Sequence, residues 1–323
     1  MDNDKQSKDR LRYENIVIVN SEQEANSITH NGTFHCDEVF ATVILSLVLP
    51  EVRLFRESNV SDKAKESISY IYDIGEGELD HHQKGGNGRR PDGISYASCG
   101  LMWNKCKDII LDKMEIDDSE VDRQDIFDMM DRELIESIDA HDNGEVKIEK
   151  TNFNDLTVSQ IVANYNPAWD ADEFVTDNTQ FIRAVKAADE IFNEELQYVI
   201  SKAKAKKRID KLIEESENGI LVLDLHMPWE DAIYYSKVEK AKDILYVVFP
   251  SRRGGYNVQA VPVFPRSFEV RKKLPEAWAG LRNKELQDVT GIESATFCHN
   301  ARFLGVCEQL EDAIKMANLA INN

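Results

Sequence analysis

The residues of this chain best suited to chemistry are histidines that stand beside carboxylates in two short runs. The first run is His30-Asn31-Gly32-Thr33-Phe34-His35-Cys36-Asp37, and the second is Leu79-Asp80-His81-His82-Gln83. Four of the seven histidines lie in these two runs. Neutral imidazole and carboxylate together are the ligand set of borderline divalent metals such as Mn, Fe, Co and Zn. The two runs therefore predict a metal site.

A structural role for the histidines is the plainer alternative. A single histidine pair is weak evidence for a metal, because such pairs often bond backbone carbonyls or lie on the surface. Two clusters that each follow an apolar run favour a site. No serine, cysteine or glycine-rich phosphate loop competes for the role, since Gly254-Gly255 falls far short of a P-loop.

Composition sets the class of protein. With 323 residues, of which 42% are hydrophobic and 30% charged, we expect a folded protein of about two domains. The net charge of −20 argues against a protein that coats nucleic acid by general electrostatics. The start, Met1 to Glu14, is polar, no apolar run is long enough to span a membrane, and five scattered cysteines indicate a reducing compartment. We therefore expect a cytoplasmic protein; the sequence leaves self-association open.

The elements that position the two runs read as α/β. Ile16 to Val19 and Val52 to Phe55 are expected to be strands of a parallel sheet, and a helix is expected from Asp37 to Pro50. Ile68 to Ile74 reads as a further strand with Asp73 at its carboxyl end. Ligands usually collect at this edge of open α/β sheets, so Asp73 and the two runs are expected to meet there.

Later segments are expected to add helices and a second sheet. Helices are predicted from Tyr96, over Asp125 to Ile138, and over Asp170 to Ile213; the second leads into Asp139-Ala140-His141-Asp142-Asn143-Gly144. Strands are predicted at Ile220 to Leu223, Ile244 to Phe249 and Val258 to Val263, the last two paired as a hairpin, with a final helix from Glu308. The loop from Gln83 to Asp92 is expected to be mobile. Its Lys84, Arg89 and Arg90 either touch a phosphate or solvate the loop.

Hydrolysis of a phosphoester by two metal ions sets a further requirement. The ions lie about 3.5–4 Å apart and share a ligand. A carboxylate can bridge two ions and an imidazole cannot, so the histidines are expected to be terminal ligands and an aspartate the bridge. The candidate ligands are His30, His35, His81, His82, Asp37, Asp73, Asp80, Asp139 and Asp142.

Three runs carry a resemblance to a known family. Thr29 to Glu38, Leu79 to Gln83 and Asp139 to Gly144 resemble the DHH phosphoesterase superfamily, and in particular its melanocyte-proliferating-gene-one branch of exonucleases. Val258 to Pro262 and Leu274 to Arg282 are similar to the carboxyl half of that family. The resemblance therefore covers nearly the whole chain.

The resemblance implies a role for each candidate residue. His30 and His35 would hold one ion, Asp37 and His81 the other, with Asp73 as the bridge. Either Asp139 or Asp142 would complete the shell of the second ion. His82 would polarise the phosphate or protonate the leaving group, and Asp80 would fix the His81 ring. Mn is the implied metal, with Mg, Co or Fe as alternatives, and His35 departs from the Asp that superfamily relatives often carry.

The expected function follows from this resemblance. The chain is expected to be a metal-dependent phosphodiester hydrolase, a 3′-to-5′ exonuclease acting on RNA or short oligonucleotides. Residues 1–205 would form a parallel-sheet metal-binding domain, and residues 206–323 a smaller α/β domain that closes the cleft. The expected substrate contacts are Lys84, Arg89, Arg90, Arg252, Arg253, Arg271, Lys272, Lys273 and His299. The alternatives are a small-molecule phosphatase such as a manganese pyrophosphatase, and a non-enzymatic binding module stabilised by metal.

Overall fold

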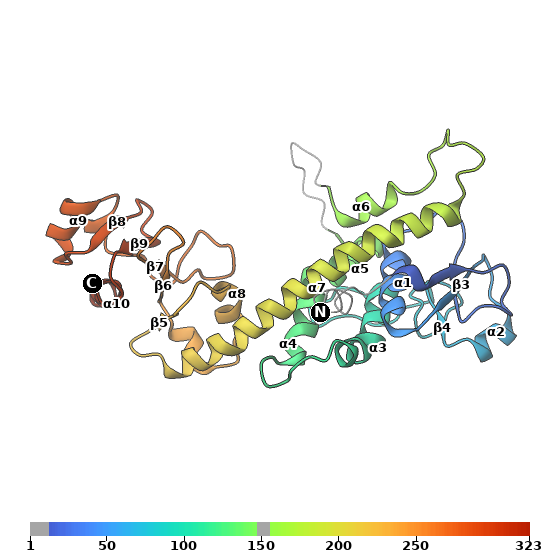
Figure 1. Ribbon diagram of the computed structural model, residues 1–323, viewed down its shortest axis with the longest axis horizontal. Helices are drawn as coiled ribbons and strands as arrows, with labels where there is room; N and C mark the ends of the chain where they lie inside the picture. Colours follow the sequence, from blue (N-terminus) through green and yellow to red (C-terminus); the bar gives the residue numbers. More distant parts are fainter. Residues whose placement is uncertain (1–12, 147–155) are drawn as a thin grey trace, which may run out of the picture. The chain divides into compact units, whose positions relative to one another are not determined.

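The computed structural model describes residues 13–146 and 156–323 (Figure 1). Most of the polar start, Met1 to Glu14, lies outside these ranges. The chain divides into two compact units, one of Met1–Ser119 with Arg123–Ile200 and one of Glu120–Asp122 with Ser201–Asn323. The division falls within the helix α7 (Asp177–Glu215). Within the described ranges, no helix is long and apolar enough to cross a lipid bilayer.

The first unit is built on a parallel sheet. Its strands are β1 (Ile16–Ile18), β2 (Ser27–Thr29), β3 (Val52–Arg56) and β4 (Tyr70–Ile71), in the order β1-β3-β2-β4. All three pairings are parallel, which confirms the predicted α/β class. Strand β2 was not predicted, because its three residues are too few to show a period. Its carboxyl end leads directly to His30.

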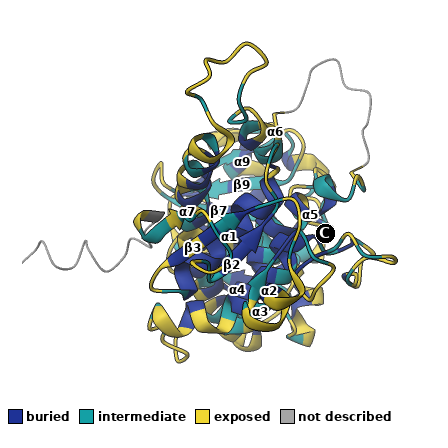
Figure 2. Cartoon of the chain, turned by 90° about the vertical axis from the view of Figure 1, so that its right-hand side faces the viewer, coloured by how far each residue is buried: buried dark blue, intermediate teal, exposed yellow. Residues whose placement is uncertain are grey.

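Helix α1 (Cys36–Val48) occupies the centre of this unit, and every one of its residues is buried (Figure 2). Most of its residues are apolar, as expected for a helix that is covered on all sides, and the polar Glu38, Thr42 and Ser46, four residues apart on one face, are buried as well. On the sheet side, Thr42 Oγ1 lies 2.6 Å from the hydroxyl of Tyr72, just beyond β4. Helices α3 (Ser98–Lys113), α5 (Glu136–Asp142) and α6 (Val158–Ala163) also contact α1. The amino end of α1 is therefore held in place by the core.

Other helical segments of this unit include α2 (Asp62–Ser67), which was not predicted, and α4 (Arg123–Met130) with the π-helical turn η2 (Asp131–Ile135), which lie along a predicted helix. The segments α4, η2 and α5 form one helical path, longer than the predicted Asp125 to Ile138. The helix predicted from Asp170 begins instead at Asp177, because Val175 and Phe174 belong to a turn whose amides bond Asp172.

The second unit has a mixed sheet. Its strands are β5 (Ile220–Val222), β6 (Tyr246–Pro250), β7 (Tyr256–Ala260), β9 (Leu304–Cys307) and β8 (Ala295–Cys298), in that order. The predicted hairpin of β6 and β7 is confirmed. Helices α9 (Asn283–Thr290) and α10 (Leu310–Asn322) pack with alternate strand residues such as Val258 into one core, and α8 (Trp229–Tyr234) belongs to another. Strands β8 and β9 and helices α8 and α9 were not predicted.

Candidate metal centre

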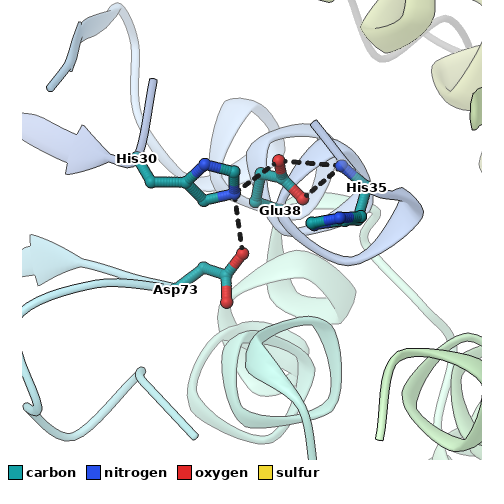
Figure 3. Close-up of side chains that lie close together, drawn as sticks. All are labelled: His30, His35, Glu38 and Asp73. Atoms are coloured by element: carbon teal, nitrogen blue, oxygen red, sulfur yellow. Dashed lines mark hydrogen bonds and ion pairs between the residues drawn. The ribbon is translucent and has the colours of Figure 1, made fainter. Parts of the chain in front are cut away.

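The loop between β2 and α1 brings two histidines to one place (Figure 3). His30 Nε2 lies 2.8 Å from Glu38 Oε1 and 3.2 Å from Asp73 Oδ2. Its Nδ1 lies 2.9 Å from the carbonyl of Asn31, which can only accept, so Nδ1 carries a proton. The ring of His35 lies 5.8 Å from that of His30, and His30, His35, Glu38 and Asp73 form one group with ligand atoms within 4.8 Å of one another.

Glu38 is the residue of this group that the sequence analysis did not assign. It is fully buried, and both its oxygens accept from the His35 amide at 3.0 Å. This is the geometry of a capping box, in which a residue three positions into the helix reaches back to the cap. The spacing of His35 and Glu38 is the signal that could have identified it.

Asp73 stands between the two histidine runs. One carboxylate oxygen, Oδ2, faces His30, and the other, Oδ1, lies 3.2 Å from His81 Nε2. Its backbone has φ 57°, in the left-handed region. Aspartate and asparagine tolerate this region better than most residues, and such conformations cluster at functional sites. The turn after β4 thereby aims one carboxylate at both imidazoles.

Asp37 meets the amino end of another helix. Its two oxygens accept from the amides of Ser98 (3.0 Å) and Cys99 (2.6 Å), the first residues of α3. Such amides and the helix dipole favour a negative charge. Burial and then the charges of Asp73, Asp142 and Asp139 nevertheless raise the pKa of Asp37 well above its usual range. This position therefore favours a cation nearby.

His81 lies close to both Asp37 and Asp142. Its Nε2 lies 3.0 Å from Asp142 Oδ2, and the three residues form a second group of ligand atoms. Its Nδ1 lies 3.2 Å from Asn143 Oδ1. The Asn143 amide group donates to the carbonyls of Ser95 and Asp139, so its oxygen is the atom that faces the ring. His81 thus donates through Nδ1 and keeps Nε2 for Asp73 and Asp142.

The structure corrects the implied role of Asp80. Asp80 Oδ1 accepts from the amide of His82 at 3.0 Å and lies 2.8 Å from His82 Nδ1, while Oδ2 accepts from the amide of Glu76. Asp80 therefore orients His82, and Asn143 orients His81. The His82 side chain is 60% exposed.

Asp139 and Asp142 are distinguished by their partners. Asp139 Oδ2 accepts from Arg90 Nη2 at 2.7 Å, and its Oδ1 accepts from the amide of Gly100. A side chain at Gly100 would overlap Asp139 Oδ2 and crowd Arg90. Asp139 is in none of the groups of ligand atoms found among the described residues, whereas Asp142 is in one.

Arg90 was predicted to lie on a mobile loop and to contact the substrate, and the structure places it elsewhere. Arg90 is buried and forms a bidentate pair with Asp131, at 2.7 and 2.6 Å, besides its bond to Asp139. The loop is tied down further by Asn87, which donates to the carbonyl of Glu78, and by Arg89, which bonds Glu145. Lys84 is exposed. Arg90 is therefore an internal ion-pair residue and cannot reach a substrate phosphate from this position.

The basic residues predicted as substrate contacts in the second unit fall into two groups, those bonded to backbone carbonyls and those exposed. Arg271 Nη1 donates to the carbonyls of Ala241 (2.6 Å) and Ile244 (2.9 Å), and Lys272 Nζ to that of Ile321, so both side chains bond the protein's own backbone. Lys273 is exposed, and His299 packs on Phe303 with ring centroids 4.5 Å apart. Arg252 and Arg253 are exposed and line a hollow of about 770 Å³.

The proton balance of the centre shows that its donor set fits divalent metal ions. Burial opposes charge on His30, yet hydrogen bonds to Asp73 and Glu38 raise its pKa to about 11. His81 is likewise raised to about 11, against its burial, by Asp142 and Asp73. These two bonds lower the pKa of Asp73 to about 2, although burial alone would raise it. Two positively charged imidazoles, those of His30 and His81, thus lie on either side of Asp73 in the metal-free protein. Divalent metals could replace these charges, because mixed imidazole and carboxylate donors suit them.

Comparison with known proteins gives the family. The MYG1 exonuclease family model, described as Uncharacterised protein family (UPF0160), matches residues 27–321. The chain belongs to the MYG1 exonuclease family. It is 31% identical to the "MYG1 protein" of Dictyostelium discoideum over 91% of this chain and 95% of that one. It is also 31% identical to the "MYG1 exonuclease" of Mus musculus and 30% identical to that of Homo sapiens, over 91% of this chain and 84% and 85% of theirs.

Membership of the MYG1 exonuclease family confirms the resemblance noted in the sequence. The match begins at Ser27, in β2, and ends at Ile321, in α10, so it includes the metal centre and both units. The name of the family supports a nuclease-type hydrolase. No solved structure matches the chain.

The proton balance gives a prediction for metal binding. In the metal-free protein His30 and His81 are protonated at neutral pH, because their pKa values lie at about 11. Metals bind unprotonated imidazole, so affinity should rise with pH, and binding should release at least the two protons of these rings per chain. Calorimetry with Mn²⁺ in buffers of different ionisation enthalpy measures this number. Binding near neutral pH without proton release would contradict the proposed ligand set.

The contact of Asn143 with His81 gives a second prediction. Asn143→Ala should weaken Mn²⁺ binding about 10- to 100-fold, the usual effect of removing a group that orients a metal ligand. Asn164→Ala is a matched control, since Asn164 also caps a helix, α6, at its carboxyl end. Equal metal affinity of the two variants, measured by calorimetry, would show that the bond to His81 has no influence on the metal.

Proposed function

We propose that this protein is a metal-dependent phosphodiester hydrolase that acts as a 3′-to-5′ exonuclease on RNA or short oligonucleotides, with two metal ions. The observation that carries the proposal is the position of Asp73, whose oxygens lie 3.2 Å from His30 Nε2 and 3.2 Å from His81 Nε2. A carboxylate so placed can serve two ions at once. Relatives named MYG1 exonuclease support the nuclease activity.

Two sets of residues would hold the ions. The first set is His30, His35 and Asp73, with Glu38 beside them, and the second is Asp37, Asp73, His81 and Asp142. When bound, two such ions stabilise the attacking and leaving oxygens of a phosphodiester displacement as Lewis acids. We propose Mn as the metal, because borderline ligands of this kind suit it, with Mg, Co or Fe as alternatives.

His82 and Asp80 are the proposed catalytic pair. Asp80 accepts from Nδ1 of His82 at 2.8 Å and fixes the ring with Nε2 outward. Nδ1 of His82 lies 3.5 Å from Oδ1 of Asp73, so the His82 ring borders the candidate metal centre. A proton on Nε2 can hydrogen-bond a phosphate oxygen or pass to the leaving oxygen, as a general acid does.

The hollow of the second unit supports a substrate larger than pyrophosphate. Its lining includes the rings of Phe249 and Phe297, the amides of Asn257 and Gln259, and Arg252 and Arg253. Single-stranded RNA is recognised by stacking on aromatic rings and by hydrogen bonds to base edges, with basic side chains on phosphates. We propose that Arg252, Arg253, Lys273 and, in the first unit, Lys84 contact the RNA.

Two other functions use the same centre. A pyrophosphatase would need the metal ligands and no hollow with aromatic and amide groups, so this hollow favours RNA. A binding module stabilised by metal would need a closed set of four ligands, as structural sites have. The groups of ligand atoms here involve His30, His35, Asp37, Glu38, Asp73, His81, His82 and Asp142, too many for such a site.

The cytoplasm is the proposed location. All five cysteines are free and buried. Unpaired cysteines are typical of a reducing compartment, where disulfides rarely form.

Asp73→Asn tests the proposed bridge. Asparagine also tolerates the left-handed backbone at this position, so the fold should persist. We expect loss of one Mn²⁺ per chain and a fall in kcat of roughly 100-fold or more, because an ion contributes several kcal/mol to such a reaction. Asp189→Asn is the control, since Asp189 is buried on α7 outside the metal centre. Two tightly held ions in Asp73→Asn, by elemental analysis, would exclude Asp73 as the bridge.

The arginines of the hollow test the substrate. The logarithm of kcat/KM for an RNA oligomer should fall with the logarithm of salt concentration, and replacing Arg252 and Arg253 by Ala should flatten the slope by about 0.7 per lost contact. Arg266→Ala with Lys284→Ala removes two exposed charges outside the hollow as a control. An unchanged slope together with full activity on pyrophosphate would favour the pyrophosphatase.

A further inference from the structure

The buried residue Arg56 lies beside the loop that carries His30 and His35. It ends β3 and is paired in register with Thr29, the last residue of β2. Arg56 is only 5% exposed. An arginine is rarely buried unless its charge and its donors are matched, so its partners should reveal its purpose.

The guanidinium donates to the backbone of the loop at two points. Nε donates to the carbonyl of His30 at 3.1 Å, and Nη2 to that of Gly32 at 3.0 Å. Gly32 has φ +77°, so the chain turns sharply between these two carbonyls. The two bonds fix the direction in which the chain leaves His30.

The far side of the guanidinium is anchored to helix α7. Nη1 donates to Asn178 Oδ1 at 3.1 Å, and the group lies 4.3 Å from the ring centroid of Phe181. Phe181 in turn packs edge-on against Phe34, which belongs to the loop. Arg56 therefore joins the loop to a strand on one side and to a helix on the other.

We propose that Arg56 is a positioning residue for the metal centre, whose planar fork sets the geometry of the His30 and His35 half. The inference rests on the two-ion function proposed above. Lysine could keep the charge, but its three donors radiate from one atom and cannot reproduce the planar fork. The ion held by His30 and His35 should therefore depend on Arg56, and the ion held by His81 and Asp142 should not.

A purely electrostatic role is the competing explanation. The charge of Glu38 acts on Arg56, although burial is the larger influence and lowers the pKa of the guanidinium. If Arg56 served only to balance Glu38, a lysine at position 56 would suffice for metal binding. If Arg56 served only to hold the fold, its replacement would weaken both ions together.

Calorimetric Mn²⁺ titrations of the full chain separate these explanations. We compare the wild type with Arg56→Lys, Arg56→Met and Arg53→Lys. Arg53 is the matched control: it lies on the same strand, its side chain is 48% exposed, and it bonds the carbonyl of Glu24. Should Arg56→Met fail to fold, Asn178→Ala replaces it, because this change frees only Nη1.

The expected result is selective. Arg56→Lys should weaken one of two Mn²⁺ sites about 10- to 100-fold and leave the other within about twofold, in the range found for groups that orient metal ligands. Asn178→Ala should weaken the same site by less, and Arg53→Lys should match the wild type. Two unchanged sites in Arg56→Lys, or equal weakening of both sites, would overturn the inference. A wild type that binds fewer than two ions would instead overturn the proposed function.

Discussion

The first unit buries several carboxylates close together, and the repulsion among their charges must be offset for this arrangement to be stable. Asp37, Glu38, Asp73, Asp80 and Asp139 are each at most 4% exposed. Two like charges 4 Å apart repel by about 4 kcal/mol at an effective dielectric constant of 20, so the group needs positive charge nearby. Part of it is built in: the amides at the start of α3 serve Asp37 and Asp139, and Arg90 serves Asp139 and Asp131. The remainder falls around Asp73, which His30 and His81 each approach to 3.2 Å and where divalent ions would complete the balance.

Short elements suffice to position the residues of this centre. Strands of two and three residues suffice in β4 and β2, because each leads at its carboxyl end to one candidate ligand, Asp73 and His30 respectively. Helix α1 carries Asp37 and Glu38 in its first turn. Because every residue of this helix is buried, the surrounding core fixes their positions. Capping therefore serves chemistry as well as stability, since Glu38 bonds its own helix end and faces His30. The second unit adds a separate polar and aromatic hollow, which extends the proposed function from phosphate chemistry to recognition of a nucleic acid.

The sequence predicted the parts of this arrangement that depend on local pattern. The parallel sheet, the helix that opens beside His35 and the β6–β7 hairpin follow from apolar periodicity and turn residues. Contacts between distant segments were not predictable in this way. Arg90 reads as a basic loop residue until Asp131 and Asp139 are folded against it, and Arg271 and Lys272 read as a basic patch until they bond carbonyls. The contact of Asn143 with His81 was not predictable either, because His81 lies far back in the chain. The choice of Asp142 over Asp139 likewise required the position of Arg90.

The central claim is that one carboxylate, Asp73, joins two metal ions. Low-temperature electron paramagnetic resonance of the protein loaded with two equivalents of Mn²⁺ tests it directly, because ions that share a carboxylate are magnetically coupled. We expect the spectrum of a coupled Mn²⁺ pair in the wild type and that of a single isolated ion in Asp73→Asn. A wild-type spectrum of isolated ions at full loading would contradict it.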